Sequence, residues 1–366
     1  MAMTTTPAVQ PFPLYSARGS NRDLGLQHGE QAREQIRAHL DALQRSLGLA
    51  TAAFEERALA FQPLFEEHCP HLVEEIEGLA RGAGISFAGG LAINTRGALG
   101  APNAAVDGGC TAFVIGREAA EQGEVLIGQT SDMLPETIDF AYVLRLHPVD
   151  KTAMLMWTFG GMIGYHGLNA LGVAHMANDL GDGGPGRRFA MPHYPVKRMM
   201  YECTTVAEVV ALLRRVPLWS NGNYVLCDGA GSILDIEATS AGPELIEDDG
   251  RGYITHTNHY CSARYATEEN AAATYADSFP RLARINAFLA DRSGSFSVGD
   301  LRAALSDHAN YPTSICRHAS SSNPDDGFET AGVTAAALIA EPEQGRLHIA
   351  PGNPCSSPFT TYELDA

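Results

Sequence analysis

The hydrophobic pattern of this chain changes at one junction, Gly108-Gly109-Cys110, and the change limits the folds available to it. Before the junction, apolar residues recur at helical spacing with charges between them, as in residues 72–79. After it, short apolar runs are bounded by glycine, proline or aspartate, which is typical of antiparallel strands. The sequence therefore predicts a mostly helical first segment and a sheet-rich remainder.

The expected elements follow from these periodicities. A short strand before residue 18 precedes helices over residues 19–47, 49–65, 72–82 and from 87 onward, the first of them capped by Ser20 or Asn21. Strands are predicted over residues 111–115, 125–128, 141–146, 153–159, 172–176, 223–228, 232–238, 252–256, 333–339 and 346–350. Further helices are predicted over residues 194–202, 206–214, 278–289 and 298–306. Helices on both sides of an extended antiparallel sheet system are the simplest layered solution.

Size and composition exclude several classes of function. The 366 residues suffice for one large domain or two ordinary ones, and 45% hydrophobic with 19% charged residues is ordinary for a soluble globular protein. The formal charge of −18 argues against nucleic acid and anionic membranes as partners. Seven cysteines without a CxxC pair, and a start without signal-peptide features, predict a reducing, cytoplasmic setting.

Cys110 is the first candidate for chemistry. The unhindered glycines before it let the thiol reach back to the carbonyl of Gly109. Breakage of that peptide bond would leave Cys110 with a free amine, which titrates at about 7.7–8.0, close to a cysteine thiol at roughly 8.5. A nucleophile that uses an N-terminal amine as its base is a known activation scheme. The alternative is a turn followed by an inert core cysteine.

Three polar residues downstream are further candidates. Asp132 ends a predicted strand, from which its carboxylate can reach the strand that starts at Cys110; a solvated turn aspartate is the alternative. Asn178 follows a glycine-punctuated apolar run and either lines a pocket or belongs to the fold architecture. Arg317 presents a rigid fork of donors to a carboxylate, of a substrate or of an ordinary structural ion pair.

The Thr257-Asn258-His259 segment offers a different chemistry. The Asn258 amide has two uncharged donors, which suit a developing oxyanion. The histidines at 256 and 259 have metal-like spacing, but a zinc site needs three or four ligands, and no acidic or cysteine partner stands at a supporting spacing. We therefore predict no metal site and no cofactor.

Other catalytic signatures are missing from the sequence. The stretch 181–186 (GDGGPG) lacks the strand–turn–helix context and the lysine of a phosphate cradle. There is no Gly-x-Ser-x-Gly elbow, no HExxH and no Walker motif. A cysteine–histidine pair of the papain kind lacks that family's local signature around Cys110.

The chain as a whole resembles the penicillin acyltransferase family, which belongs to the N-terminal-nucleophile hydrolases. The resemblance spans nearly the whole chain, and it rests on the order and spacing of modest motifs. These motifs lie at residues 18–20, 24–29, 75–85, 107–111, 128–132, 167–169, 257–259 and 314–317.

The resemblance implies an α+β fold, a four-layer αββα sandwich of the N-terminal-nucleophile hydrolase type. It implies self-cleavage between Gly109 and Cys110 into an α chain (1–109) and a β chain (110–366) that stay associated. Cys110 would be the nucleophile in cleavage and turnover, with a thioester to the substrate's acyl group. Asp132 matches the aspartate implicated in processing, Asn258 the oxyanion residue and Arg317 an arginine that supports the site electrostatically. Thr111, Asn178 and His259 are the candidates for substrate contact.

Two departures and two alternatives remain. Thr130-Ser131 stands where the family often has Asn-Trp, so the pocket and its substrate are expected to differ. The C-terminus is not a peroxisomal address, which makes penicillin a doubtful natural substrate. The expected substrate is a small amide or acyl thioester, handled by hydrolysis or by acyl-CoA-dependent transfer of the penicillin type. A binding protein that keeps the fold and has lost processing is the alternative from another class, and an oligomer is compatible with either.

Overall fold

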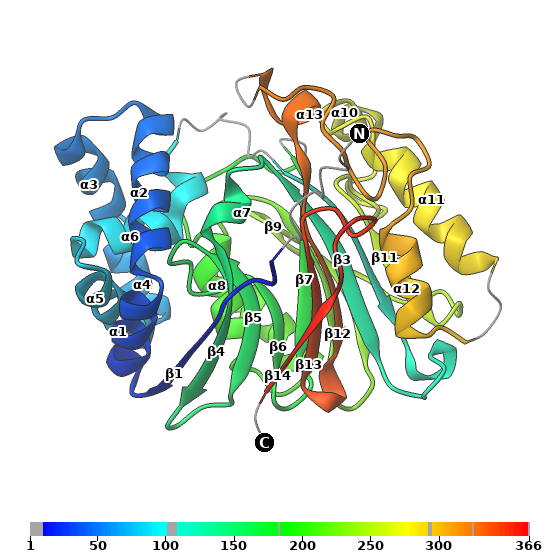
Figure 1. Ribbon diagram of the computed structural model, residues 1–366, viewed down its shortest axis with the longest axis horizontal. Coiled ribbons are helices and arrows are strands. Elements are labelled where there is room, and N and C mark those ends of the chain that lie inside the picture. The colour runs from blue at the N-terminus through cyan, green and yellow to red at the C-terminus, as the bar shows by residue number, and fades with distance from the viewer. Residues whose placement is uncertain (1–9, 101–107, 182–183, 292–294, 324–325, 365–366) are drawn as a thin grey trace, which may run out of the picture.

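Two stacked β-sheets form the centre of the molecule (Figure 1). The computed structural model describes residues 10–100, 108–181, 184–291, 295–323 and 326–364. The first sheet has eight strands in the order β1-β4-β5-β6-β7-β8-β9-β10, and the second has six in the order β11-β2-β3-β12-β13-β14. Within the described residues, no helix is both long and apolar enough to cross a membrane.

The strands of the first sheet are β1 (Leu14–Gly19), β4 (Ala141–Pro148), β5 (Met154–Phe159), β6 (His166–Asn169), β7 (Ala174–Asp179), β8 (Gly222–Cys227), β9 (Ile233–Thr239) and β10 (Gly242–Ile246). Those of the second are β2 (Gly109–Ile115), β3 (Leu126–Met133), β11 (Tyr253–His256), β12 (Val333–Glu341), β13 (Arg346–Pro351) and β14 (Thr360–Glu363). Within the described residues, the pairings between these strands are antiparallel except that of β1 with β4.

Helices cover the outer face of each sheet, so that the expected four-layer αββα arrangement is confirmed (Figure 1). The helices on the eight-stranded side are α1 (Asn21–Gln31), α2 (Arg33–Leu47), α3 (Thr51–Leu59), α4 (Gln62–His68), α5 (Pro70–Ala83), α6 (Phe87–Thr95), α8 (His193–Met200) and α9 (Val206–Arg215). The helices packed on the six-stranded sheet are α11 (Ser278–Ala290) and α12 (Val298–Leu305). The short helices are α7 (Thr137–Phe140), α10 (Glu268–Ala272) and α13 (Phe328–Ala331).

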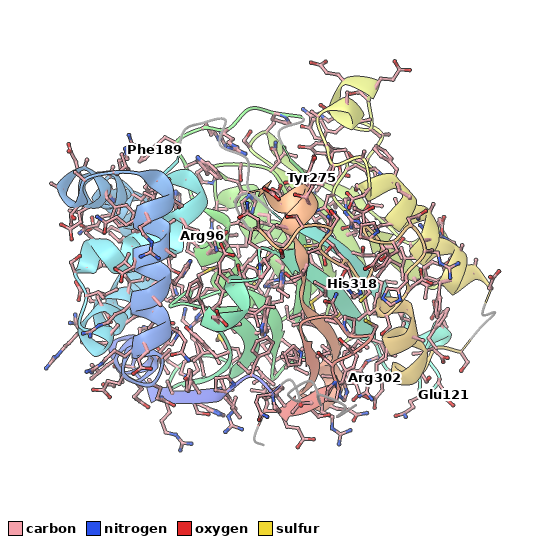
Figure 2. The ribbon with its side chains drawn as sticks, turned by 45° about the horizontal axis from the view of Figure 1, so that its top comes forward. Arg96, Glu121, Phe189, Tyr275, Arg302 and His318 are labelled. Carbon is pink, nitrogen blue, oxygen red and sulfur yellow. The ribbon has the colours of Figure 1, made fainter. Side chains whose placement is uncertain are left out.

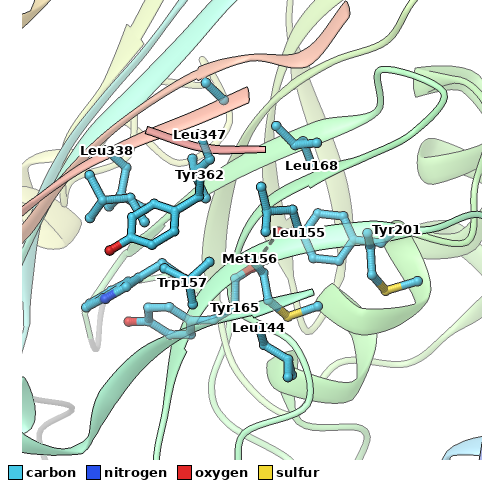
Figure 3. Packing of buried hydrophobic residues seen from close by; sticks show 14 of the residues in the cluster. Leu144, Leu155, Met156, Trp157, Tyr165, Leu168, Tyr201, Leu338, Leu347 and Tyr362 are labelled. Atoms are coloured by element: carbon cyan, nitrogen blue, oxygen red, sulfur yellow. Dashed lines mark hydrogen bonds between the residues drawn. The ribbon is translucent and has the colours of Figure 1, made fainter. Parts of the chain in front are cut away.

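Alternation along the strands decides which side chains face the space between the sheets. In β2, Ala112 and Val114 belong to the inter-sheet cluster, whereas Phe113 and Ile115 pack with the helices outside. Trp157 of the first sheet and Leu338 and Tyr362 of the second belong to the same inter-sheet cluster (Figure 3). Cys110 has the same parity as Ala112, so its side chain belongs to the inter-sheet face.

Helices α1 and α5 approach each other closely because both carry glycines on the facing stripe. A Cβ at Gly25 would lie 1.8 Å from the carbonyl oxygen of Glu75, and one at Gly78 would lie 2.2 Å from that of Arg22. Such distances exclude any side chain, so the backbones themselves form the contact. This crossing accounts for two of the motifs on which the family resemblance rests.

The structure corrects several details of the expected elements. The predicted helix over residues 19–47 is two helices that meet at Ala32, and the one over 49–65 is α3 and α4. Ser20 is the residue that caps α1, with a capping box closed by Asp23. The sequence did not predict β6, β10, β14 or the parallel pairing of β1.

Candidate active site

Cys110 lies near the start of β2, at the wall of a cavity of about 450 Å³. It pairs with Ser131 of β3, and 7% of its surface is exposed. The inter-sheet parity of the strand turns the sulfur toward the cavity. The thiol is therefore placed where a small molecule can reach it.

Hydrogen bonds fix the backbone on both sides of the Cys110 α-carbon. The nitrogen of Cys110 donates to Oδ1 of Asn258 at 2.9 Å, and Nη1 of Arg281 donates to the carbonyl oxygen of Cys110 at 2.6 Å. Nη2 of Arg281 also donates to Oδ1 of Asn258 at 2.8 Å. Asn258, Arg281 and the Cys110 backbone thus form a closed, buried set of hydrogen bonds.

A chain of charges continues from Arg281 to Asp132. Asp277 lies 3.4 Å from Nε of Arg281 and forms an ion pair with Nη2 of Arg317. Nε of Arg317 lies 3.7 Å from Oδ2 of Asp132, and Thr334 Oγ1 donates to Oδ1 of Asp132 at 2.7 Å. Arg317 and Asp132 are both buried, so these ion pairs act in a poorly screened environment.

Asp132 is the last residue of this series of ion pairs and lies beside Gly109. Together with Asn258 and Arg281 it forms a ring of polar side chains around the Gly109–Cys110 bond. Asp132 and Gly109 are register partners in β3 and β2. A Cβ at Gly109 would lie 3.1 Å from Oδ2 of Asp132 and 3.1 Å from the Phe328 ring. The absence of a side chain at Gly109 therefore lets the Asp132 carboxylate pack against this residue. The Gly109–Cys110 bond is therefore flanked by Asp132 on one side and by Asn258 and Arg281 on the other.

Burial dominates the electrostatics of this site in the uncut chain. Burial, with the Asp132 carboxylate adding to it, raises the pKa of the Cys110 thiol to about 12. Burial also raises the pKa of Asp132 to about 6, although the Arg317 and Arg281 cations oppose the rise. The Cys110 thiol of the intact chain is thus protonated at neutral pH and needs a base before it can attack.

The cavity next to Cys110 is lined by aromatic rings and by polar side chains, among them one buried amide without a hydrogen-bond partner among the described residues and one buried ammonium. The amide is that of Asn178, whose side-chain oxygen and nitrogen have no hydrogen-bond partner among the described residues. The ammonium is that of Lys197, 4.5 Å from the ring centre of Tyr165 and 5.5 Å from that of Tyr194. Burial lowers the pKa of Lys197 to about 8. The cavity therefore offers both aromatic surface and polar groups to a ligand.

Comparison with known proteins identifies the family. Residues 119–354 match the family model described as acyl-coenzyme A:6-aminopenicillanic acid acyl-transferase. The chain belongs to this acyl-transferase family. A relative from Emericella nidulans, "Acyl-coenzyme A:6-aminopenicillanic-acid-acyltransferase 40 kDa form", is 25% identical over 307 residues, which cover 82% of this chain and 84% of the relative.

Two solved structures have some likeness to this chain. One is the C2A mutant of the conjugated bile acid hydrolase from Clostridium perfringens, with a TM-score of 0.45, 11% identity and coverage of 69% of this chain and 97% of that one. Another is penicillin V acylase from Agrobacterium tumefaciens, with a TM-score of 0.36, 10% identity and coverage of 71% and 79%.

In this acyl-transferase family member, the structure brings together the main residues singled out in the sequence. Cys110, Asp132, Asn258 and Arg317 all belong to the ring around the junction. Nδ2 of Asn258 donates one of its two N–H groups to the carbonyl of Asp179 at 2.9 Å. The other N–H can donate to a ligand.

The three residues expected to contact substrate lie in different places. Asn178 lines the cavity beside Cys110. Thr111 has the opposite strand parity and accepts from Nη1 of Arg281 at 3.0 Å. His259 is bound to Ser278 at 2.7 Å and lines a separate pocket. Neither Thr111 nor His259 is among the described residues that line the Cys110 cavity.

Sequence reasoning missed Arg281, Asp277 and Lys197. A signal for Arg281 was present, because it stands four residues before Ile285 and eight before Leu289 on the apolar stripe of α11. The histidines 256 and 259 do not converge: Nε2 of His256 meets Glu237 at 3.3 Å, whereas His259 turns to Ser278.

Proposed function

We propose that this chain is a self-processing N-terminal-nucleophile enzyme that transfers or hydrolyses acyl groups through a thioester on Cys110. The observation that carries the proposal is the ring of Asn258, Arg281 and Asp132 around the Gly109–Cys110 bond, with the Cys110 sulfur at the cavity wall. Family membership supports the acyl chemistry.

In the proposed processing step, the Cys110 sulfur attacks the carbonyl carbon of Gly109. The thiol proton passes to the Cys110 nitrogen, the C–N bond breaks, and a thioester joins Gly109 to the sulfur. Water then hydrolyses this thioester, which leaves a carboxylate on Gly109 and a free thiol and amine on Cys110. The Oδ1 atom of Asn258, which holds the nitrogen at 2.9 Å in the intact chain, then holds the new amine.

In the proposed turnover, that amine is the base that the buried thiol lacks. An α-amino group titrates near 7.7–8.0, so roughly a tenth to a sixth of it is unprotonated at pH 7 and about half near pH 8. It accepts the thiol proton, the thiolate attacks the substrate's acyl carbon, and the amine returns the proton to the leaving group. The second N–H of Asn258 and the amide of Asn178 are the proposed hydrogen-bond donors to the oxyanion that forms on the substrate.

The cavity supports a substrate class as well. Its rings, among them Phe140, Phe159 and Tyr165, suit an acyl chain, and the Lys197 ammonium suits a carboxylate. We propose that one substrate is a small amide or amine that carries a carboxylate beside its reacting nitrogen. The name of the Emericella nidulans relative includes 6-aminopenicillanic acid, which has both an amine and a carboxylate, and an acyl-coenzyme A, which is an acyl thioester.

A product assay with the purified chain tests this function. N-acyl amino acids, β-lactams and acyl-CoA thioesters are supplied as donors, each with and without an amine acceptor that carries a carboxylate. We expect an acyl–enzyme adduct on the peptide that begins at Cys110, and products of transfer, hydrolysis or both. Cys110→Ala is the control that forms no adduct. A wild type that binds these compounds without an adduct or product would favour the binding-protein alternative.

A further inference from the structure

Four side chains of the kinds that can bind a metal meet at a place that the sequence spacing did not reveal. His308, Cys316 and His318 lie between α12 and β12, and Cys355 lies between β13 and β14. Their ligand atoms all lie within 4.8 Å of one another. Figure 2 shows His318 on the side of the molecule that also carries Arg302 of α12.

The spacing of these atoms matches a tetrahedral metal. Nε2 of His318 lies 3.1 Å from Nε2 of His308, 3.6 Å from Sγ of Cys316 and 3.6 Å from Sγ of Cys355. A tetrahedral zinc with bonds of about 2.3 Å to sulfur and about 2.0–2.1 Å to nitrogen holds its donor atoms roughly 3.3–3.8 Å apart. Three of the separations therefore need only a few tenths of an ångström of adjustment.

We propose that His308, Cys316, His318 and Cys355 bind one Zn²⁺ ion in a closed structural site. Two cysteines and two histidines are a donor set that prefers zinc to calcium or magnesium, whose ligands are oxygen atoms. On binding, each thiol gives a proton to solvent, so two thiolates neutralise the dication and both imidazoles remain neutral. All four positions around the metal are filled by protein, which leaves none for a catalytic water.

The surrounding backbone holds two of the ligands in place before a metal arrives. The nitrogen of Cys316 donates to the carbonyl of Asp307 at 3.1 Å, and that of His318 donates to the carbonyl of Pro312 at 2.9 Å. Nδ2 of Asn353 donates to the carbonyl of Arg317 at 2.6 Å and lies 3.5 Å from Sγ of Cys316. Asn353 thus ties the loop of Cys355 to the loop of the other three ligands and offers an N–H to a thiolate.

The position of the site gives the metal a role. Cys316 and His318 flank Arg317, whose guanidinium reaches Asp277 and Asp132 on the other side of the same backbone. A zinc ion would fix the loop that presents Arg317 and would act on the candidate active site through that positioning residue. The metal site does not depend on the proposed function, because its ligands lie outside the Cys110 cavity.

Metal analysis of the full chain, purified under reducing conditions without added chelator, tests the site. We expect about one zinc per chain in the wild type, and Co²⁺ exchanged into the site should give the visible absorption of a tetrahedral thiolate complex. The double variant His308→Ala/Cys355→Ser should lose at least ten-fold in zinc content and show no such band. Both of these residues are exposed, so the variant keeps its core. Cys203→Ser, outside the cluster, is the control and should retain the metal.

Thermal unfolding, which does not depend on activity, completes the test. Removal of zinc should lower the thermal midpoint of the wild type by several degrees and leave that of the double variant unchanged. A wild type that takes up neither zinc nor cobalt would overturn the proposal. So would equal zinc content in the double variant, or a Cys316–Cys355 disulfide found by mass spectrometry in the reduced preparation.

Discussion

Arg281, buried in α11, donates to the Cys110 carbonyl and to Asn258 Oδ1, and so links both sides of the nucleophile. Replacement by methionine removes these charged hydrogen bonds while filling similar space. Hydrogen bonds to charged groups contribute about 1.5–3 kcal/mol each, so we expect Arg281→Met to slow the appearance of the two fragments by roughly 10- to 100-fold. The time course of cleavage after purification measures this rate. Arg264→Met, at an exposed arginine paired with Glu244, is the control and should cleave at the wild-type rate.

Asn258 has an acceptor role and a donor role that one substitution separates. Asn258→Asp keeps an oxygen for the Cys110 nitrogen and for Arg281, and it removes the amide N–H groups. We expect processing to continue and kcat to fall by about 10²–10³, the usual loss for one oxyanion donor. Steady-state kinetics of the processed variant give the result. An unchanged kcat would remove Asn258 from oxyanion stabilisation.

The lowered pKa of Lys197 predicts that substrate binding depends on pH. Because burial lowers its pKa to about 8, the ammonium is present below that pH and is lost as pH rises through it. We expect the KM for a carboxylate-bearing substrate to be flat below about pH 8 and to rise above it. The same measurement with a neutral analogue should show no rise, and Lys197→Met should have a high, pH-independent KM. The same rise of KM in Lys197→Met as in the wild type would contradict this role.

How far the sequence predicts the site depends on the kind of signal at each residue. Cys110, Asp132, Asn258 and Arg317 were singled out because they stand in motifs of a recognisable family. Asp277 and Lys197 stand in no such motif, since their roles come from burial against elements distant in the chain. The proposed zinc ligands were missed for the same reason: His308 and Cys355 are 47 residues apart and meet only after folding.

At the scale of elements, the contact between α1 and α5 is the part of the fold most sensitive to added volume. Gly25→Ala would place a methyl group 1.8 Å from the Glu75 carbonyl oxygen, so the helices must separate. We expect a loss of about 1–3 kcal/mol or more in the free energy of unfolding. Gly299→Ala in α12 is the matched control, because its Cβ meets nothing nearer than 3.5 Å and alanine favours a helix. Thermal or denaturant unfolding of the two variants measures the difference, and equal stability would contradict the close crossing.

Some helices and strands have a recognisable sequence pattern and others do not. Long amphipathic helices such as α5 and α11 and buried strands such as β5 were predicted because their apolar periodicity is strong. The edge strands β10 and β14 were missed because they are short and mostly unburied, and neither contains a long apolar run. The parallel pairing of β1 with β4 joins segments more than 120 residues apart, and nothing local in either strand specifies it.

At the scale of the whole molecule, the proposed fragments share one core. Residues before the junction supply β1 and the layer from α1 to α6, and a buried ion pair of 3.1 Å joins Glu75 of α5 to Arg198 of α8. Separation would break this ion pair and would expose the apolar face of the helical layer to water, and the exposure of apolar surface is costly. Cleavage between Gly109 and Cys110 is therefore expected to leave one particle in native solution.

The most direct test of the account is the intact mass of the purified wild type, measured under denaturing and native conditions beside Cys110→Ala. We predict two wild-type fragments in denaturant, residues 1–109 and 110–366, the second with Cys110 at its N-terminus, and one complex of both in native solution. Cys110→Ala should remain a single chain under both conditions. An uncleaved wild type that nevertheless turns over its substrate would contradict the central claim that the free amine of Cys110 activates its thiol.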